Sequence, residues 1–268
     1  MKRICVILLL FTASCTIAPR ISVSNTNTAG GNVVINGKIY TTAYQQRAAE
    51  YRALCYQAYN IAHQRVDEII LSKTEKPKVI ITDIDETIFD NSAYEAHQTL
   101  QGKDYSSDSW YEWSSMIRAD TVPGSLNFFK YASSKGIEIF YGTNRGERER
   151  NFTLKNLQKF NFPDADSAHL FPIQNTSSKE SRRQSIAANH TIVMLIGDNL
   201  GDVSSLFDKK SSAERNQNVN EVAAEFGNRF IILPNPVYGD WESSLYNYNY
   251  SLNASQKDSA IKASLHSY

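Results

Sequence analysis

Two pairs of acidic residues each directly follow a short apolar run. Asp83 and Asp85 are two residues apart, so in an extended segment their side chains project to the same side. Asp198 and Asp202 are four residues apart, which is the spacing of neighbours on one helical face. Keeping neighbouring carboxylates ionised without a cation is unfavourable, so a bound metal or a raised pKa is expected. No Cys pair and no clustered His accompany them, so the four acids predict an oxygen-only site that suits Mg²⁺ best.

A second set of polar residues could hold a phosphoryl group. Thr143 and Asn144 follow another apolar run, and Lys179 lies in a polar segment further along the chain. A hydroxyl, the backbone N–H groups at a helix start and an ammonium can together bind an oxyanion. Thr143 could instead cap a helix, and Arg182 and Arg183 are near enough in sequence to compete for the role of Lys179.

A sheet must position these side chains. Four short apolar runs each end in polar residues, and near-continuous apolar runs are typical of strands buried on both faces. Helical segments at 125–135 and 146–160 alternate with them, which indicates a parallel sheet with right-handed crossovers. The predicted fold class is α/β, a Rossmann-like parallel sheet flanked by helices, in which ligands bind at the carboxyl ends of the strands. The predicted strands are 79–82, 137–141, 192–196 and 230–233.

The other segments divide the chain further. Residues 44–72 are predicted to be helical, because apolar residues recur at three- and four-residue steps. Cys55 lies on this stripe and is expected to be a small buried hydrophobe. The insertion 89–122 is rich in Trp and Tyr, and with 44–72 it is expected to form a small, mainly helical cap. The folded domain is predicted over 44–250, and 251–268 is predicted to be a C-terminal tail.

The N-terminus has the pattern of an export signal. Two basic residues, a short apolar segment and three small residues precede Cys15. Residues 1–14 are therefore predicted to be a signal peptide, too short in its apolar part to span a bilayer. Cys15 resembles the lipidated cysteine of bacterial lipoproteins, although Thr12 stands where Leu is usual; the alternative is an ordinary secretory signal. Residues 15–43, rich in Ser, Thr, Asn and Gly, are predicted to be a flexible tether.

Composition limits the partners. The 268 residues carry 28 Lys and Arg against 28 Asp and Glu, so the formal net charge is zero. A protein that coats nucleic acid would carry a basic excess, so no nucleic-acid polymer is expected as a partner. An apolar fraction of 41% supports a globular core and excludes disorder across the whole chain. No apolar run of about 18 residues is present, so no internal transmembrane helix is predicted.

The ordered set of motifs resembles a known superfamily. Asp83-x-Asp85, Thr143, Lys179 and Asp198-x-x-x-Asp202 resemble motifs one to four of the haloacid-dehalogenase superfamily. Over roughly residues 44–245, the surrounding segments resemble the class C bacterial acid phosphatases, also called lipoprotein acid phosphatases. Those segments are DIDETIFDNSAY (83–94), VPG (122–124), FYGTNR (140–145), GDNLGD (197–202) and LPNPVYGDWE (233–242).

The resemblance implies a function and a location. Relatives of this kind are exported, Mg²⁺-dependent phosphatases, often lipid-anchored, that hydrolyse phosphate monoesters, some of them directed at 5′-nucleotides. It implies an outer-membrane lipoprotein held by a lipid on Cys15, or otherwise a periplasmic or secreted protein. Its partners would be small phosphate monoesters, with nucleoside monophosphates as candidates, and the membrane.

The resemblance also implies roles for the acids. Asp83 would be the nucleophile that forms an aspartyl-phosphate. Asp85 would be the general acid for the leaving alkoxide and then the general base for water. Mg²⁺ would bind the Asp83 carboxylate, the backbone carbonyl of Asp85, and Asp198, with Asp202 completing or orienting the ligand shell.

Substrate contacts are implied in the same way. Thr143, Asn144 and Lys179 would hold the transferring phosphoryl group. Tyr238 follows the last predicted strand, and the family uses an aromatic residue near this position, so Tyr238 is a candidate substrate contact. Other aromatic residues could stack on a base, but packing in the core or cap explains each of them equally well. These are Tyr94, Trp110, Trp113 and Trp241.

Two other functions stay open at this point. A surface lipoprotein could keep the fold as a binding or adhesion module, although the complete set of motif residues counts against this. A phosphotransferase would use the same residues and transfer the phosphoryl group to an alcohol instead of water.

Overall fold

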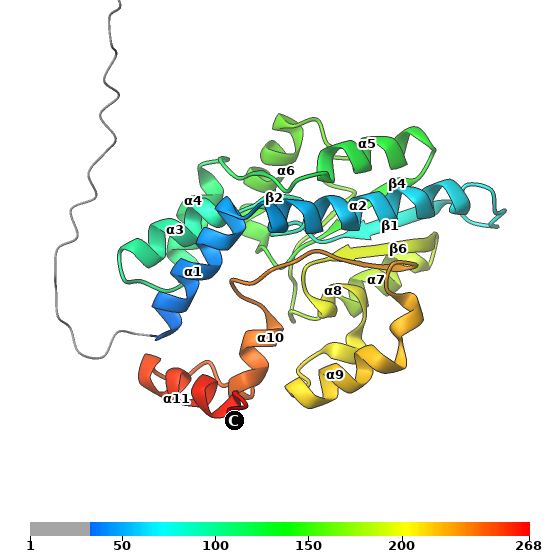
Figure 1. Ribbon diagram of the computed structural model, residues 1–268. Helices are drawn as coiled ribbons and strands as arrows, with labels where there is room; N and C mark the ends of the chain where they lie inside the picture. Colours follow the sequence, from blue (N-terminus) through cyan, green and yellow to red (C-terminus); the bar gives the residue numbers. More distant parts are fainter. Residues whose placement is uncertain (1–32) are drawn as a thin grey trace, which may run out of the picture. The chain divides into compact units, whose positions relative to one another are not determined.

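The computed structural model describes residues 33–268, and its centre is a five-stranded parallel sheet (Figure 1). The strand order is β5-β4-β1-β6-β7, and every neighbouring pair is parallel. The α/β prediction and its four strands are confirmed, while β5 is an edge strand of two residues, too short to show a pattern in the sequence. The strands are β1 (Lys78–Thr82), β4 (Glu138–Gly142), β5 (Leu170–Phe171), β6 (Thr191–Gly197) and β7 (Phe230–Ile232).

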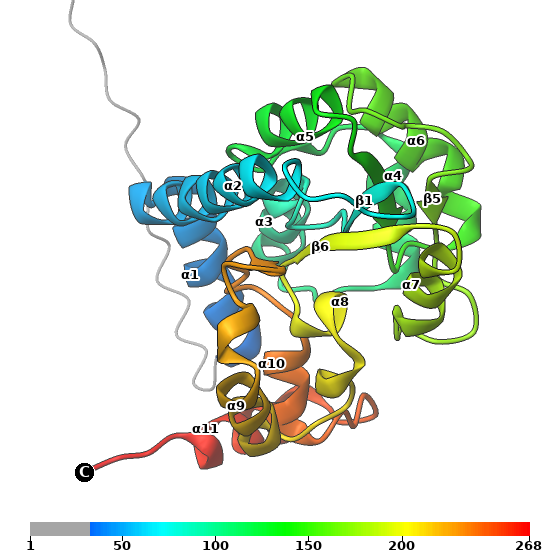
Figure 2. The same ribbon diagram turned by 90° about the vertical axis from the view of Figure 1, so that its right-hand side faces the viewer.

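Helices cover both faces of the sheet, which explains its continuous apolar runs (Figure 2). In β1, Ile80 packs into the layer of α2, α5 and α6, whereas Val79 and Ile81 pack into the opposite layer with α7 and α8. Alternate residues of one strand therefore belong to different halves of the core. The helices are α2 (Ala49–Ile69), α5 (Ser125–Ser134), α6 (Arg150–Lys159), α7 (Glu180–Ala187) and α8 (Leu200–Val203).

The insertion between β1 and α5 contains two helices and a small hairpin. Strand β2 (Phe89–Asp90) pairs antiparallel with β3 (Asp120–Thr121), so the insertion leaves and rejoins the core at one place. Between them lie α3 (Ser92–Leu100) and α4 (Ser107–Ser115), and the Ser106 hydroxyl caps α4 by accepting a hydrogen bond from the Ser109 N–H.

Two predicted boundaries differ from the structure. The tether predicted over 15–43 is helical from residue 33, because α1 (Val33–Arg47) packs against α3 and α11. The tail predicted over 251–268 contains α11 (Ala254–Ser264), whose first turn is capped by Asn253. Helix α2 was predicted within the cap segment 44–72, but its apolar face, including Cys55, belongs to the core beside the sheet.

The remaining helices lie in the C-terminal third of the chain. They are α9 (Ser212–Glu221), α10 (Asp240–Ser243) and the 3-10 turns η2 (Ser205–Phe207), η3 (Ala223–Glu225) and η4 (Ser244–Tyr246), while η1 (Glu147–Glu149) precedes α6. Within residues 33–268, none of the helices has the length and apolar character needed to cross a membrane. The predicted signal peptide and Cys15 lie outside the described residues.

Candidate active site

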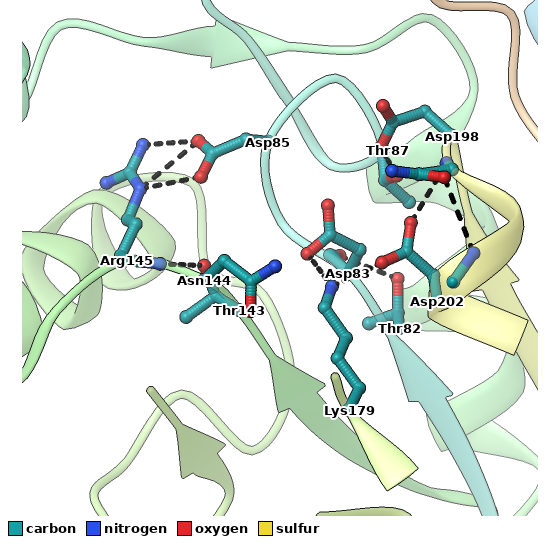
Figure 3. Close-up of polar contacts among 12 residues, drawn as sticks. Thr82, Asp83, Asp85, Thr87, Thr143, Asn144, Arg145, Lys179, Asp198 and Asp202 are labelled. Carbon is teal, nitrogen blue, oxygen red and sulfur yellow. Dashed lines mark hydrogen bonds and ion pairs between the residues drawn. The ribbon is translucent and has the colours of Figure 1, made fainter. Parts of the chain in front are cut away.

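The parallel register brings residues that are distant in sequence to one edge of the sheet. Thr82 at the end of β1 pairs with Tyr141 of β4 on one side and with Ile196 of β6 on the other. The residues that follow these strand ends, Asp83 and Asp198 among them, therefore meet at the carboxyl end of the sheet (Figure 3).

Three of the predicted acids form one cluster. Asp83, Asp198 and Asp202 each offer a carboxylate oxygen, and these oxygens all lie within 4.8 Å of one another. A set made only of carboxylate oxygens suits a hard divalent cation such as Mg²⁺. The Asp85 side chain is not part of this group and turns toward Arg145 (Figure 3).

Neighbouring side chains and one glycine fix the cluster. Asp198 accepts hydrogen bonds from the Thr87 hydroxyl (3.0 Å) and from the Asn235 amide (2.8 Å). Asp202 accepts the backbone N–H of Asn199 (2.9 Å), which caps α8. Gly197 makes room for Asp202, because a Cβ at this glycine would lie 2.3 Å from the Asp202 Cβ.

Burial and mutual repulsion raise the pKa values of the acids in the cluster. Burial raises the pKa of Asp83 well above its usual value, since the attraction of Lys179 only partly offsets burial and three neighbouring carboxylates. Burial, with repulsion from Asp202, raises the pKa of Asp198 to about 7. Positive charge in the cluster would favour the ionised forms.

Lys179 supplies one such charge. Its ammonium lies 2.6 Å from Asp202 Oδ1 and also contacts Asp83 Oδ1, and its side chain is 6% exposed. Burial acts to lower the pKa of Lys179, but Asp202 and Asp83 outweigh burial and raise it, so the ammonium is charged. Of the three basic candidates in this segment, Lys179 is the one that forms ion pairs with the carboxylates of the acid cluster.

Arg182 and Arg183 have other partners. Arg182 donates to the Thr143 carbonyl (2.5 Å) and to Asn144 Oδ1 (2.9 Å). Arg183 donates to the carbonyls of Gly201 and Asp202. Both arginines therefore shape the loops around the site.

The two residues after β4 differ in solvent exposure. Thr143 is 1% exposed, and its hydroxyl accepts the backbone N–H of Arg145 (3.0 Å), which matches the alternative of a local capping role. Asn144 is exposed and lines the cavity described below. Because Arg182 holds the Asn144 oxygen, the Asn144 NH₂ group is the end left to bind an anion.

A cavity of about 510 Å³ opens over the cluster. Its inner wall includes Asp83, Asp85 and Lys179, and its outer wall comes from the insertion, α1 and the C-terminal segments. Tyr238 also lines it, and the Tyr238 hydroxyl donates to the buried carboxylate of Glu86. The space is large enough for a phosphate ester together with an organic leaving group.

Several functional neighbours were not predicted from the sequence. Arg145, Glu86, Asn91, Thr87 and Asn235 each contact a predicted site residue. All of them fall inside the quoted motif segments, so position within those segments was the available signal. A local pattern could not reveal partners that are distant in the sequence, which lie 111 residues apart for Thr87 and Asp198 and 152 residues apart for Glu86 and Tyr238.

Comparisons with known proteins indicate one family and its fold. The family model described as HAD superfamily, subfamily IIIB (Acid phosphatase) matches residues 3–241. The structure of the class C acid phosphatase from Bacillus anthracis matches with a TM-score of 0.85 and 38% identity, covering 88% of this chain and 99% of that chain. A crystal structure of class C acid phosphatase from the same organism with tungstate bound gives the same values.

Proposed function

Because the chain belongs to the acid phosphatases of HAD superfamily subfamily IIIB and is a phosphomonoesterase, we propose that it is an exported, Mg²⁺-dependent enzyme that acts through an aspartyl-phosphate. The supporting observation is the contact between Lys179 and Asp83 at the inner wall of the cavity, where a carboxylate meets a cation that can neutralise phosphate. Nucleoside monophosphates are the proposed substrates.

The proposed reaction has two steps. Asp83 attacks phosphorus, the bond from phosphorus to the leaving oxygen breaks, and Asp85 gives that oxygen a proton. Asp85 then takes a proton from water as the water oxygen attacks phosphorus, which releases inorganic phosphate and restores the Asp83 carboxylate. Lys179 and the Asn144 amide hold the phosphoryl oxygens in both steps.

The acid cluster fits the proposed metal. Asp83, Asp198 and Asp202 would hold Mg²⁺ together with the backbone carbonyl of Asp85. When bound, the ion supplies the charge that lets an anionic carboxylate approach an anionic phosphate.

Hydrolysis assays test this proposal. Purified protein is given p-nitrophenyl phosphate and a panel of nucleoside monophosphates at mildly acidic pH, with Mg²⁺ or with EDTA. We expect EDTA to abolish turnover and Asp83→Asn to reduce it by at least about 10³-fold, because the covalent route is lost. Asp120→Asn, at an exposed position on β3, is the matched control and should leave the rate unchanged. Unchanged turnover in Asp83→Asn would refute the covalent mechanism.

The same assays identify the molecule that accepts the phosphoryl group. Adding glycerol separates hydrolysis from transfer, because a phosphotransferase would form glycerol phosphate in place of inorganic phosphate. We expect inorganic phosphate to account for the substrate consumed.

A further inference from the structure

Two side chains hold the Asp85 carboxylate. The Arg145 guanidinium donates from Nε to both oxygens (3.1 Å each) and from Nη2 to Oδ1 (2.7 Å). The Asn91 amide donates to the same Oδ1 (2.9 Å). We call this pair the Arg145–Asn91 clamp. It engages Oδ1 through three donors and leaves Oδ2 with the Nε contact among the described residues, so Oδ2 keeps the capacity for a further partner.

Arg145 is itself fixed from several sides. Its side chain is 2% exposed, and Nη1 donates to the Thr153 hydroxyl (3.3 Å). The guanidinium lies over the rings of Trp110 (5.5 Å) and Phe89 (5.7 Å). A planar fork held in this way defines both the position and the orientation of the carboxylate that it binds.

Asn91 is fixed by the insertion. Its side-chain oxygen accepts the indole N–H of Trp113 (2.9 Å), and its backbone N–H donates to Glu86 Oε1 (2.8 Å). Trp110 and Trp113 both belong to α4. One helix of the insertion therefore supports both halves of the clamp.

We propose that Arg145 and Asn91 are positioning residues, which fix the Asp85 carboxylate so that Oδ2 delivers a proton to the leaving oxygen. This inference rests on the proposed role of Asp85 as general acid. When the bond between phosphorus and the leaving oxygen breaks, its electron pair stays on that oxygen, which takes the proton from Asp85. The guanidinium then faces the carboxylate that this transfer leaves behind.

Leaving groups distinguish positioning of an acid from a structural role. p-Nitrophenolate leaves as a stable anion and needs little protonation, whereas an alkoxide from glycerol 2-phosphate requires a proton as it departs. Misplacing Asp85 should therefore impair the alkyl ester far more than the aryl ester. The ratio kcat/KM is the correct measure, because it covers the steps up to cleavage of the ester and not the later hydrolysis of the intermediate.

The central variant is Arg145→Lys, which keeps the charge but loses the planar fork. We expect kcat/KM for glycerol 2-phosphate to fall by about 10²-fold or more, because general acid catalysis contributes about 10²–10⁴-fold to the rate. For p-nitrophenyl phosphate, we expect kcat/KM to fall by less than about 10-fold. Asp85→Asn should show the same split between the esters. Trp113→Phe, which removes one N–H and keeps an aromatic ring, should show a smaller split in the same direction.

Arg148→Lys is the matched control. Arg148 also contacts α4, through the Tyr111 ring and the Ser107 carbonyl, but it does not touch Asp85. Both esters should react as in the wild-type protein.

Each outcome has one meaning. Equal losses on both esters in Arg145→Lys, with a split in Asp85→Asn, would overturn the inference while leaving the proposed function intact. Wild-type protein inactive on both esters, or no split in Asp85→Asn, would instead refute the proposed function or its acid. If Arg145→Lys does not fold, Trp113→Phe is the deciding variant. A larger loss of kcat/KM for glycerol 2-phosphate than for p-nitrophenyl phosphate supports the clamp, and equal changes for the two esters overturn it.

Discussion

The ammonium of Lys179 lies 2.6 Å from Asp202 Oδ1 and also contacts Asp83, so one buried cation joins the carboxylates that follow β1 and β6. The contact holds together loops that are distant in sequence. It also places the ammonium beside two of the three carboxylates that could bind a divalent ion.

Lys179→Met should separate the binding of phosphate from the binding of metal. We expect kcat/KM to fall by about 10²-fold, because a charge that stabilises the transferring group is lost. Mg²⁺ should bind as tightly or more tightly, because an ammonium no longer engages two of its ligands. Steady-state kinetics and the Mg²⁺ dependence of Tm measure the two effects, with Lys103→Met at an exposed position as control. Loss of Mg²⁺ binding in Lys179→Met would contradict this account.

Mg²⁺ should stabilise the folded protein through the acid cluster. At 100 times the Kd, a ligand that binds the folded state alone adds about 2.7 kcal/mol, which raises the Tm of a domain of this size by about 5–10 °C. Asp198→Asn should abolish this rise, because it removes one ligand and changes the contacts with Thr87 and Asn235. Differential scanning calorimetry with MgCl₂ and with EDTA provides the measurement. A full Mg²⁺-dependent rise in Asp198→Asn would exclude Asp198 as a ligand.

Gly197→Ala should damage the site through a single methyl group. The new Cβ would lie 2.3 Å from the Asp202 Cβ, so Asp202 must move. We expect activity to fall by about 10²-fold, because a displacement of about 1 Å can have this effect on catalysis. Gly142→Ala is the matched control at the end of β4, where the nearest atom would lie at an ordinary 3.7 Å. Comparable losses in both variants would indicate a general intolerance of strand ends to alanine.

His169 should make stability depend on pH. Its ring lies between Asp166 (2.8 Å) and Glu138 (2.7 Å), and although burial acts to lower the pKa of His169, these hydrogen bonds raise it overall. A raised folded-state pKa means that the stabilisation is fully present below about pH 6.5 and is lost as the pH rises through the folded-state value. The charge of Asp164 also raises the pKa of His169, and the neighbouring rings are Phe140 and His190, whose Nε2 lies 3.4 Å from Glu138.

Urea unfolding of His169→Gln tests this dependence. The variant should lose about 1 kcal/mol relative to the wild type near pH 5, and less near pH 8. Activity should be retained, since Glu138 begins β4 whereas the site follows the ends of the strands. His266→Gln, at an exposed position, is the control. A loss of unfolding free energy in His169→Gln that grows with pH would contradict the predicted direction of the pH dependence.

Cys15→Ser should release the protein from membranes if Cys15 carries lipid. Acyl chains hold a protein at a membrane through burial of their CH₂ groups, and a serine hydroxyl cannot form the thioether. Fractionation of expressing cells, followed by immunoblotting, provides the measurement. Cys5→Ser is the matched control, because Cys5 lies within the predicted signal peptide. Continued membrane association of Cys15→Ser would contradict lipid anchoring.

The core of the fold could be predicted from the sequence because its strands carry a strong signal. β1, β4 and β6 are buried on both faces, so their apolar runs are nearly continuous. The acids at their ends could be predicted for the same reason, since parallel strands bring their carboxyl ends together.

Helix α1 and the clamp could not be predicted, for physical reasons. The face of α1 that packs on α3 includes the polar residues Lys38, Thr42 and Gln45, so no apolar stripe marks the helix. Lys38 pairs with Asp104 (2.6 Å), and Gln45 donates to Asp90 (3.0 Å), at separations of 66 and 45 residues. Arg145 pairs with Asp85 across 60 residues. Pairings of this kind depend on tertiary structure, and no local periodicity reports them.

The position of α1 has a practical consequence for shortened forms of the protein. A chain trimmed to residue 44, where composition suggests that order begins, would lack most of α1 and the Lys38 side chain that lines the cavity. Proteolytic trimming within 33–47 would also remove the surface against which α3 and α11 pack. Recombinant versions intended for crystallisation or kinetics should therefore begin no later than residue 33.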